Sequence, residues 1–344
     1  MRRNELKTDG PFRFEAGGGL DSVTLSYYTS DRAYVKGEKV VWVCHALTGN
    51  ANPEDWWPGM AGRGKFLDPD RYFIVCVSML ASPYGSCSPA TPDPATGKPY
   101  LLDFPRVTIR DMVQANIIVR KHLGIECVDY IIGPSIGGFL VSEWLVTEPG
   151  IFRKAVLLAT AVRVPPYLTA FNESMRMAML ADPTFVEAKD INGGEAGLKC
   201  ARSIALISYR TNTGYNSTQE EPDDDAVFAD RAASYQRYQG KKLVDRGFDA
   251  YSYWYLSYAL DSMNIGRGRG GTARALASIK AECTVICVES DQLFPPVTGR
   301  KIASLIPGAE YFEVASAFGH DGFLLENDSL IAILRKVFGS DCRI

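Results

Sequence analysis

The stretch Tyr130-Ile-Ile-Gly-Pro-Ser-Ile-Gly-Gly-Phe139 places Ser135 in a Gly-x-Ser-x-Gly pattern, directly after an apolar, β-rich run. Glycines at positions 133, 137 and 138 suit a sharp turn from a strand into a helix, because side chains there would clash. The start of that helix would lend its positive N-terminal dipole to the serine. We therefore expect Ser135 to be a nucleophile presented at the end of a strand, rather than a surface serine on an ordinary turn.

A serine of this kind needs a base to take its proton and a third group to hold the base. The chain has three histidines. His320 lies between glycines in Gly319-His-Asp-Gly-Phe, which favours a presented side chain. His122 lies at the C-terminal end of a predicted helix, where an imidazolium favours the helix dipole, and His45 ends an apolar strand, where we expect it to shape a loop. His320 is therefore the predicted base.

Asp291 is the predicted orienting carboxylate, since it ends the strand-like run Val-Ile-Cys-Val-Glu-Ser-Asp. Two other acids compete for this role. Asp321 adjoins the base, so its side chain should point away from the imidazole Nδ1, and Glu289 should lie within the strand. The chain order Ser135, Asp291, His320 is that of the catalytic triad in α/β-hydrolases.

Apolar strand-like runs alternate with helical patterns, which predicts an α/β-hydrolase fold: a mostly parallel sheet with helices on both faces. The predicted strands include 71–80, 128–133, 155–159, 283–289 and 310–314. Thr108 begins a helix with a capping-box acid three residues later. Strand signals vanish between 165 and 273, so we expect a helical cap inserted before the strand that carries Asp291. The core would then comprise 1–164 and 274–344.

The oxyanion hole of this fold uses the backbone N–H after the nucleophile and one from the loop after an early strand. Here these would be the N–H groups of Ile136 and of Leu47, in His45-Ala-Leu-Thr-Gly. No His, Cys or Asp cluster has metal-ligand spacing, so we predict no metal site.

Composition excludes several classes of protein. The net charge of −3 is too small to indicate a nucleic-acid or membrane partner. One Gly266-Arg-Gly-Arg-Gly-Gly segment in an acidic chain is weak evidence for RNA binding. The N-terminal residues carry no apolar signal region, and the longest apolar stretch is broken by charges and a Gly-Pro-Ser turn, so we expect a cytoplasmic location.

Several longer motifs go beyond the general hydrolase pattern. One is Asp103-Phe-Pro-Arg-Val-Thr-Ile-Arg-Asp-Met-Val113, which has no role in that pattern. With it, the chain resembles the homoserine O-acetyltransferase family over nearly its whole length. The other matching stretches are 42–49, 55–59, 93–100, 235–240, 264–271, 290–296 and 319–324.

The resemblance implies acetyl-CoA as co-substrate, homoserine as acceptor, no permanently bound cofactor, and a ping-pong mechanism through an acylated Ser135. By position in the family motifs, Arg210 would bind the substrate carboxylate and Asp321 its amine. A planar guanidinium suits a carboxylate. The family forms dimers through the cap, which implies a homodimer here.

The turn around Ser135, called the nucleophile elbow below, departs from the family pattern. The family usually has Gly-Gly-Ser-Met/Leu/Phe-Gly-Gly, whereas this chain has Pro134 before the serine and Ile136 after it. Three alternatives therefore stay open. The first keeps the chemistry but uses another donor or acceptor, as in serine O-acetyl or homoserine O-succinyl transfer. The second is a plain serine esterase. The third is a non-enzymatic relative of the hydrolases, which the complete triad argues against.

Overall fold

The computed structural model describes residues 1–339. It contains an eight-stranded sheet in the order β1-β4-β6-β5-β7-β8-β9-β10, with parallel neighbours from β6 to β10 and antiparallel pairing of β1 and β4 at one edge. Its strands are β1 (Arg2–Lys7), β4 (Thr24–Thr29), β5 (Val40–Val43), β6 (Phe73–Val77), β7 (Val128–Pro134), β8 (Phe152–Leu158), β9 (Glu282–Val288) and β10 (Glu310–Val314). Strands β2 (Phe12–Arg13) and β3 (Gly19–Leu20) form a separate small hairpin.

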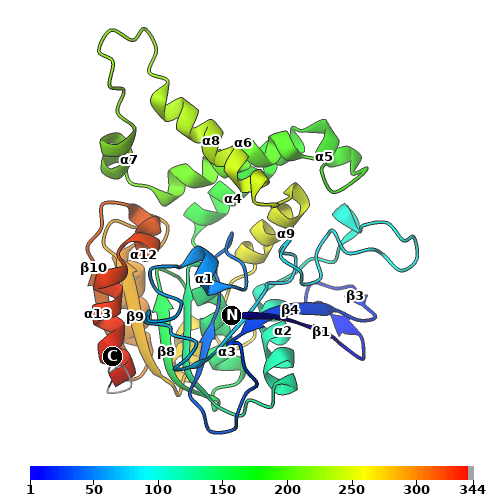
Figure 1. Ribbon diagram of the computed structural model, residues 1–344, viewed down its shortest axis with the longest axis vertical. Helices are drawn as coiled ribbons and strands as arrows, with labels where there is room; N and C mark the ends of the chain where they lie inside the picture. The colour runs from blue at the N-terminus through cyan, green and yellow to red at the C-terminus, as the bar shows by residue number, and fades with distance from the viewer. Residues whose placement is uncertain (340–344) are drawn as a thin grey trace.

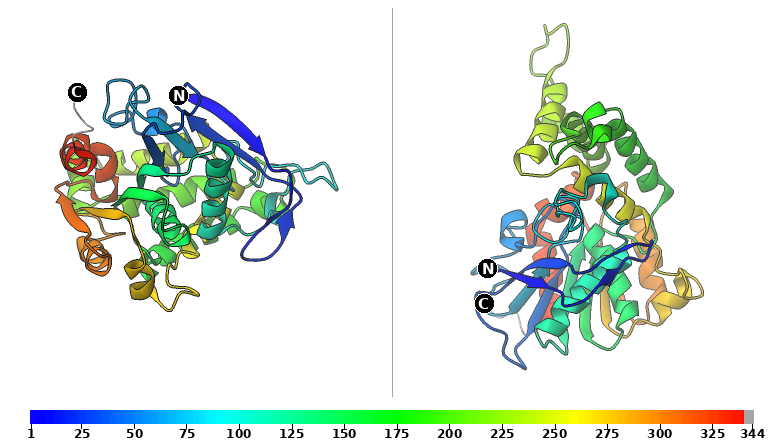
Figure 2. Two further views of the ribbon diagram at one scale, coloured as in Figure 1. Left: turned by 90° about the horizontal axis from the view of Figure 1, so that it is seen from below. Right: turned by 90° about the vertical axis from the view of Figure 1, so that its right-hand side faces the viewer.

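Helices cover both faces of this sheet (Figure 2), as predicted. Alternate residues of one strand belong to different cores: Val40 and Trp42 pack with α2 and α3, whereas Val41 and Val43 pack in the cluster that includes α13. The helices around the sheet are α1 (Pro53–Trp56), α2 (Ile109–His122), α3 (Ile136–Thr147), α10 (Thr272–Ala277), α11 (Pro296–Leu305), α12 (Gly322–Leu325) and α13 (Asn327–Phe338), with short 3₁₀ turns η1 (Leu101–Asp103) and η2 (Gly319–Asp321).

Two local elements, one predicted and one missed, show what the sequence pattern could and could not detect. The capping box is present: the Thr108 side chain accepts from the N–H of Asp111, and the Asp111 carboxylate accepts from the N–H of Thr108 at 2.8 Å. Strand β1 had no prediction, because its sequence Arg-Arg-Asn-Glu-Leu-Lys has no apolar run. As an edge strand it is largely exposed, and its hydrogen bonds to β4 hold it.

Above the carboxyl edge of the sheet stands a layer of helices that comes from one continuous segment (Figure 1). The segment leaves and rejoins the sheet layers through two chains that hydrogen-bond to each other, from the N–H of Val164 to the carbonyl of Met263 (2.9 Å) and from the N–H of Ile265 to the carbonyl of Val162 (3.0 Å). Its helices are α4 (Pro166–Leu180), α5 (Pro183–Glu187), α6 (Glu195–Tyr209), α7 (Asn212–Gln219), α8 (Arg231–Asp245) and α9 (Ala250–Asp261). The next helix, α10, packs against α11 beside the sheet.

The Gly266-Arg-Gly-Arg-Gly-Gly segment has a structural role at this junction. Arg269 donates to the buried carboxylate of Glu143 in α3 at 2.8 Å, and Arg267 donates to Glu15 at 2.8 Å. Arg269 thus ties the chain that returns from the helical layer to α3, the helix that begins just after Ser135, and Arg267 ties it to the turn between β2 and β3. Within the described chain, no helix is both long and apolar enough to cross a bilayer.

Candidate active site

Ser135 occupies a tight turn between β7 and α3. Its backbone has φ 58° and ψ −125°, a conformation that costs energy for a residue with a side chain and is typical of functional sites. The turn closes only because its flanks are glycines: a Cβ on Gly133 would lie 2.3 Å from the carbonyl oxygen of Gly137. The N–H of Ser135 donates to the carbonyl of Leu158 in β8, which holds the turn to the sheet.

The structure brings the three predicted triad residues into one hydrogen-bonded chain. Ser135 Oγ lies 2.8 Å from His320 Nε2, and His320 Nδ1 lies 2.7 Å from Asp291 Oδ2. The other carboxylate oxygen of Asp291 accepts the backbone N–H groups of Leu293 and Phe294 at 2.8 and 3.0 Å. A neutral imidazole with its proton on Nδ1 can therefore donate to a fixed carboxylate while it accepts from the serine.

The two rival acids lie elsewhere. Glu289 is exposed and is the first residue after β9, so its predicted place within the strand was wrong. Asp321 forms an ion pair with Arg210, with 2.9 Å between Oδ2 and Nε, whereas both imidazole nitrogens pair with other residues. The structure therefore leaves Asp291 in contact with the base and brings together the two residues that were predicted to bind substrate.

His320 is almost fully buried, at 4% exposure. Burial alone lowers the pKa of His320, but the charge of Asp291, its hydrogen bond and the charge of Asp321 act in the opposite direction and raise the pKa above its ordinary value. This arrangement favours the imidazolium that forms when the base takes the serine proton.

His45 lies in a different environment. Burial lowers the pKa of His45 to about 4, so the ring is neutral near pH 7. Its Nδ1 lies 2.8 Å from the carbonyl oxygen of Ala46, and its Nε2 accepts the N–H of Met79 at 3.1 Å. His45 thus joins the loop after β5 to the loop after β6.

The loop after β5 also carries Leu47, and it lies against the start of α3. A Cβ on Gly137 would lie 2.2 Å from the carbonyl oxygen of Cys44, so the two backbones are in direct contact there. Within residues 1–339, neither the N–H of Leu47 nor the N–H of Ile136 donates to a protein acceptor. An oxyanion hole requires N–H donors that are not already used, so both predicted donors remain available for that role.

Several residues that contact the triad were not predicted from the sequence. Rings of Tyr209, Phe294 and Phe323 surround the imidazole of His320, with centroids 5.7, 5.3 and 5.3 Å from its own. Thr160 donates its hydroxyl to the carbonyl of Ser135 at 2.7 Å. Phe294 and Phe323 lie three residues after Asp291 and His320, and this closeness in sequence is a weak indication that they contact the site. Tyr209 lies at the end of α6, far from the triad in sequence, so only the folded structure shows its contact with His320.

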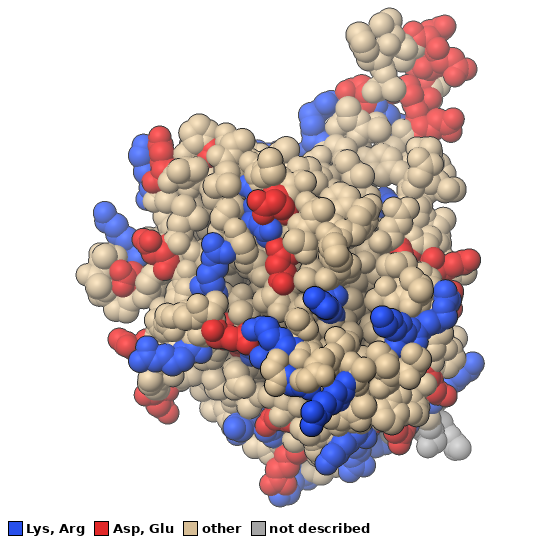
Figure 3. All heavy atoms as spheres, turned by 180° about the vertical axis from the view of Figure 1, so that it is seen from behind, with Lys and Arg blue, Asp and Glu red and all other residues tan. Residues whose placement is uncertain are grey.

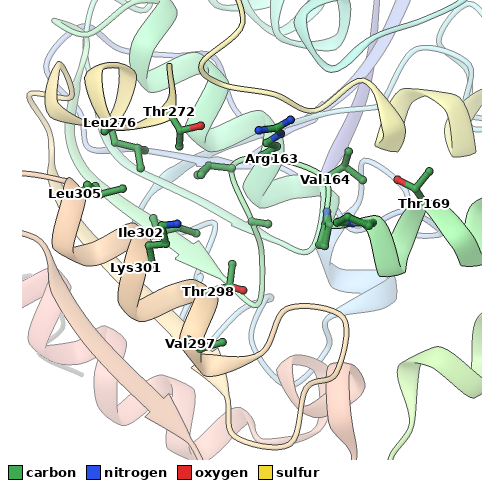
Figure 4. A pocket seen from close by; sticks show the side chains of 15 residues that line it. Arg163, Val164, Thr169, Thr272, Leu276, Val297, Thr298, Lys301, Ile302 and Leu305 are labelled. Carbon is green, nitrogen blue, oxygen red and sulfur yellow. The ribbon is translucent and has the colours of Figure 1, made fainter. Parts of the chain in front are cut away.

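Two cavities involve residues of the helical layer. One of about 1090 Å³ runs between the entry to α4, α10 and α11, and carries Arg163 and Lys301 on an apolar lining (Figure 4). No triad residue lines it. A second, of about 490 Å³, lies among α4, α6, α7 and α8 and includes Arg210 and Gln292, the residue after Asp291. No group of three or more potential metal-ligating side chains occurs in the described part of the chain.

The raised pKa of His320 predicts the pH dependence of serine acylation. Protonated His320 cannot accept the serine proton, so kcat/KM for p-nitrophenyl acetate should fall as pH drops through a midpoint above about 6.5, the ordinary imidazole value. Asp321→Asn removes a charge that raises this pKa and should move the midpoint to lower pH. Glu289→Gln, which changes an exposed acid, should leave it in place. Identical midpoints in wild type and Asp321→Asn would contradict the assignment of His320 as the group whose titration controls acylation.

The contact between Gly137 and Cys44 predicts a specific loss of activity. Gly137→Ala would force the elbow and the Leu47 loop apart and should reduce the acylation rate about a hundredfold or more, the effect of losing an oxyanion donor. Stopped-flow release of p-nitrophenol measures this rate, with circular dichroism to check folding. Gly150→Ala, whose added Cβ would meet no atom within 4 Å, is the matched control. A folded Gly137→Ala enzyme with wild-type acylation would refute this role of the contact.

Comparisons with known proteins agree with this geometry. Residues 39–327 match a family model described as the alpha/beta hydrolase fold. A solved acetylester hydrolase from Corynebacterium glutamicum is 21% identical and superimposes with a TM-score of 0.85 over 98% of this chain and 96% of that one, which reflects the shared fold. The predicted α/β-hydrolase fold is confirmed.

Closer relatives are more specific. A homoserine O-acetyltransferase from Cyclobacterium marinum is 41% identical over 328 residues, which cover 94% of this chain and 92% of the relative. The solved homoserine O-acetyltransferase from Staphylococcus aureus is 30% identical, with a TM-score of 0.79 over 97% of this chain and 94% of that one. The chain therefore belongs to the homoserine O-acetyltransferase family of the α/β-hydrolase superfamily.

Proposed function

We propose that this protein transfers the acetyl group of acetyl-CoA to the hydroxyl of L-homoserine, through an acyl-enzyme on Ser135. The observation that carries the proposal is the Ser135–His320–Asp291 chain at 2.8 and 2.7 Å, found in a member of the homoserine O-acetyltransferase family. The reaction releases coenzyme A and O-acetyl-L-homoserine and would serve methionine biosynthesis.

In the first half-reaction, Ser135 Oγ attacks the thioester carbonyl as His320 Nε2 takes its proton. The tetrahedral oxyanion receives hydrogen bonds from the N–H groups of Leu47 and Ile136. The C–S bond then breaks, the imidazolium returns its proton to the leaving thiolate, and coenzyme A departs from the acetylated serine. Asp291 stays ionised throughout and stabilises the imidazolium.

In the second half-reaction, the homoserine hydroxyl takes the place of the thiol. His320 removes its proton, the oxygen attacks the acyl-serine carbonyl, and collapse of the intermediate breaks the bond to Ser135 Oγ, which recovers its proton from His320. Each half-reaction thus returns the triad to its starting protonation state.

The Arg210–Asp321 ion pair supports an amino acid as acceptor. Both side chains are about one-fifth exposed, and their charges neutralise each other in the free protein. An amino acid carries a carboxylate for Arg210 and an ammonium for Asp321, so it can replace each partner without changing the net charge. Plain alcohols or water lack these groups and would have to leave the pair intact or break it without compensation.

The helical layer supports transfer over hydrolysis. We propose that 165–273 acts as a cap on the core formed by 1–164 and 274–344. Ser135 is only 9% exposed, and α6 brings Tyr209 against the base. A site closed in this way would limit the access of water to the acyl-serine.

Thiol release from acetyl-CoA, measured with homoserine, with serine and without an acceptor, tests this function. We expect release that depends on homoserine and is lost in Ser135→Ala, because the acyl-enzyme cannot form without the hydroxyl. Equal release without an acceptor would identify an esterase. Release with serine but not with homoserine would change the assigned acceptor, and release only from succinyl-CoA would change the assigned donor. In both cases the assignment of the triad would stand.

We also propose that the protein is a homodimer that associates through the cap. Of the twelve large apolar side chains that residues 1–339 expose, eight belong to 165–273: Tyr167, Met177, Leu180, Val186, Ile207, Val227, Phe228 and Tyr238. Apolar exposure of this kind favours association. Light scattering should give twice the chain mass, and Ile207→Asp should shift it toward the monomer; a monomeric wild-type protein would contradict the proposal.

A further inference from the structure

The cavity of about 1090 Å³ has no role in the proposed reaction. Its walls come from the chain that leads out of β8 into α4, from α10 and from α11 (Figure 4). No triad residue lines it, and neither the candidate oxyanion donors nor the Arg210–Asp321 pair belongs to its lining. The cavity is therefore a site separate from the one assigned to catalysis.

The size and the walls of this cavity are those of a ligand pocket. Its volume is just above the range of about 300–1,000 Å³ that is typical of small-molecule sites, which are mostly apolar with a few polar groups. Such walls favour a ligand with an aliphatic body, because the burial of methylene groups is favourable. The apolar lining comes from all three parts of the wall and includes Val162, Val164, Leu276, Val297, Ile302 and Leu305.

Two cations stand on this apolar lining. Arg163 comes from the chain between β8 and α4, and Lys301 comes from α11 (Figure 4). Both residues are exposed, and within residues 1–339 neither side chain has an ion-pair partner. None of the lining residues is acidic. An anionic group in the cavity would therefore meet two positive charges without a competing carboxylate.

The charges around the cavity also favour an anion. Helices α10 and α11 contain three basic residues, Arg274, Arg300 and Lys301, and no acidic one. On the side of the molecule opposite the N-terminal strand, Lys and Arg side chains stand among uncharged surface below the helical layer (Figure 3). The acidic run Asp223-Asp-Asp225 lies in the loop between α7 and α8, at the far tip of that layer.

These observations point to one chemical class of ligand. We propose that the cavity binds a medium-chain aliphatic carboxylate, with its charged head toward Arg163 and Lys301 and its methylene chain against the apolar walls. A planar guanidinium suits both oxygens of a carboxylate. An alcohol of the same length would keep the apolar contacts but lose the interaction with the two cations.

The bound carboxylate would lie against the base of the helical layer. Val162 and Val164 belong to the connecting chain that hydrogen-bonds to Ile265 and Met263, whereas α10 and α11 pack together beside the sheet. The ligand would thus bridge the connection of the helical layer and the sheet layers without entering the catalytic site.

Isothermal titration calorimetry with sodium decanoate tests the proposal. It needs no turnover, so its result is independent of the proposed function. We expect saturable binding of decanoate and weaker binding of decanol, which has no charge. Arg163→Met and Lys301→Met should each weaken decanoate binding about two- to fivefold, the range for exposed ion pairs, and the double variant about tenfold. Lys280→Met, which removes an exposed lysine outside the lining, is the matched control.

Two further variants separate this cavity from other sites. Ala273→Trp, which fills the cavity, should weaken decanoate binding more than the charge variants do, and it tests the site if those variants do not fold. Ser135→Ala should bind decanoate as the wild type does, because the serine does not line the cavity.

Four results would overturn this assignment. No saturable binding below the concentration at which decanoate forms micelles, or equal affinity in wild type, the double variant and Ala273→Trp, would refute the site. Weaker binding in Ser135→Ala would place decanoate in the active site. An equal loss in Lys280→Met would attribute the effect to general surface charge. A shift of Ala273→Trp from dimer to monomer in light scattering would assign the cavity to contact with a second copy of the chain.

Discussion

The close approach of the start of α3 to the end of β5 is the constraint on which the active site depends. At Gly137 the helix backbone comes so near the carbonyl of Cys44 that no side chain fits between them. This contact sets the distance between the elbow that presents Ser135 and the loop that carries Leu47. The nucleophile and the two candidate oxyanion donors are therefore positioned by one backbone contact, and the strained dihedrals of Ser135 follow from the same tight turn.

The helical layer contacts the candidate active site directly. A Cβ on Gly319, which has φ 62°, would lie 2.7 Å from the carbonyl oxygen of Tyr209, so the loop that carries His320 packs directly on the end of α6. The next residue of that chain, Arg210, pairs with Asp321. The imidazole of His320 thus contacts the sheet on one side, through Asp291, and the helical layer on the other, through Tyr209. Movement of α6 would disturb both the imidazole and the proposed acceptor site.

Much of this site could be predicted from sequence because its determinants are local. Ser135 follows a strand and has glycine neighbours, and Asp291 and His320 follow later strands, whose carboxyl ends meet at one edge of a parallel sheet. The aromatic ring of Tyr209 could not be predicted, since its contact with His320 depends on how α6 packs. The polar edge strand β1 was missed for a related reason: pairing with β4 holds it, and it has no apolar pattern of its own.

The central claim is that Ser135 carries the acyl group and that the closed site preserves it for the acceptor. Peptide mass spectrometry of the enzyme mixed with acetyl-CoA alone would test this directly. We predict one added acetyl group on the peptide that contains Ser135, which persists until homoserine is supplied and is then discharged rapidly. No adduct on Ser135, an adduct on another residue, or discharge as fast in water as with homoserine would contradict the account.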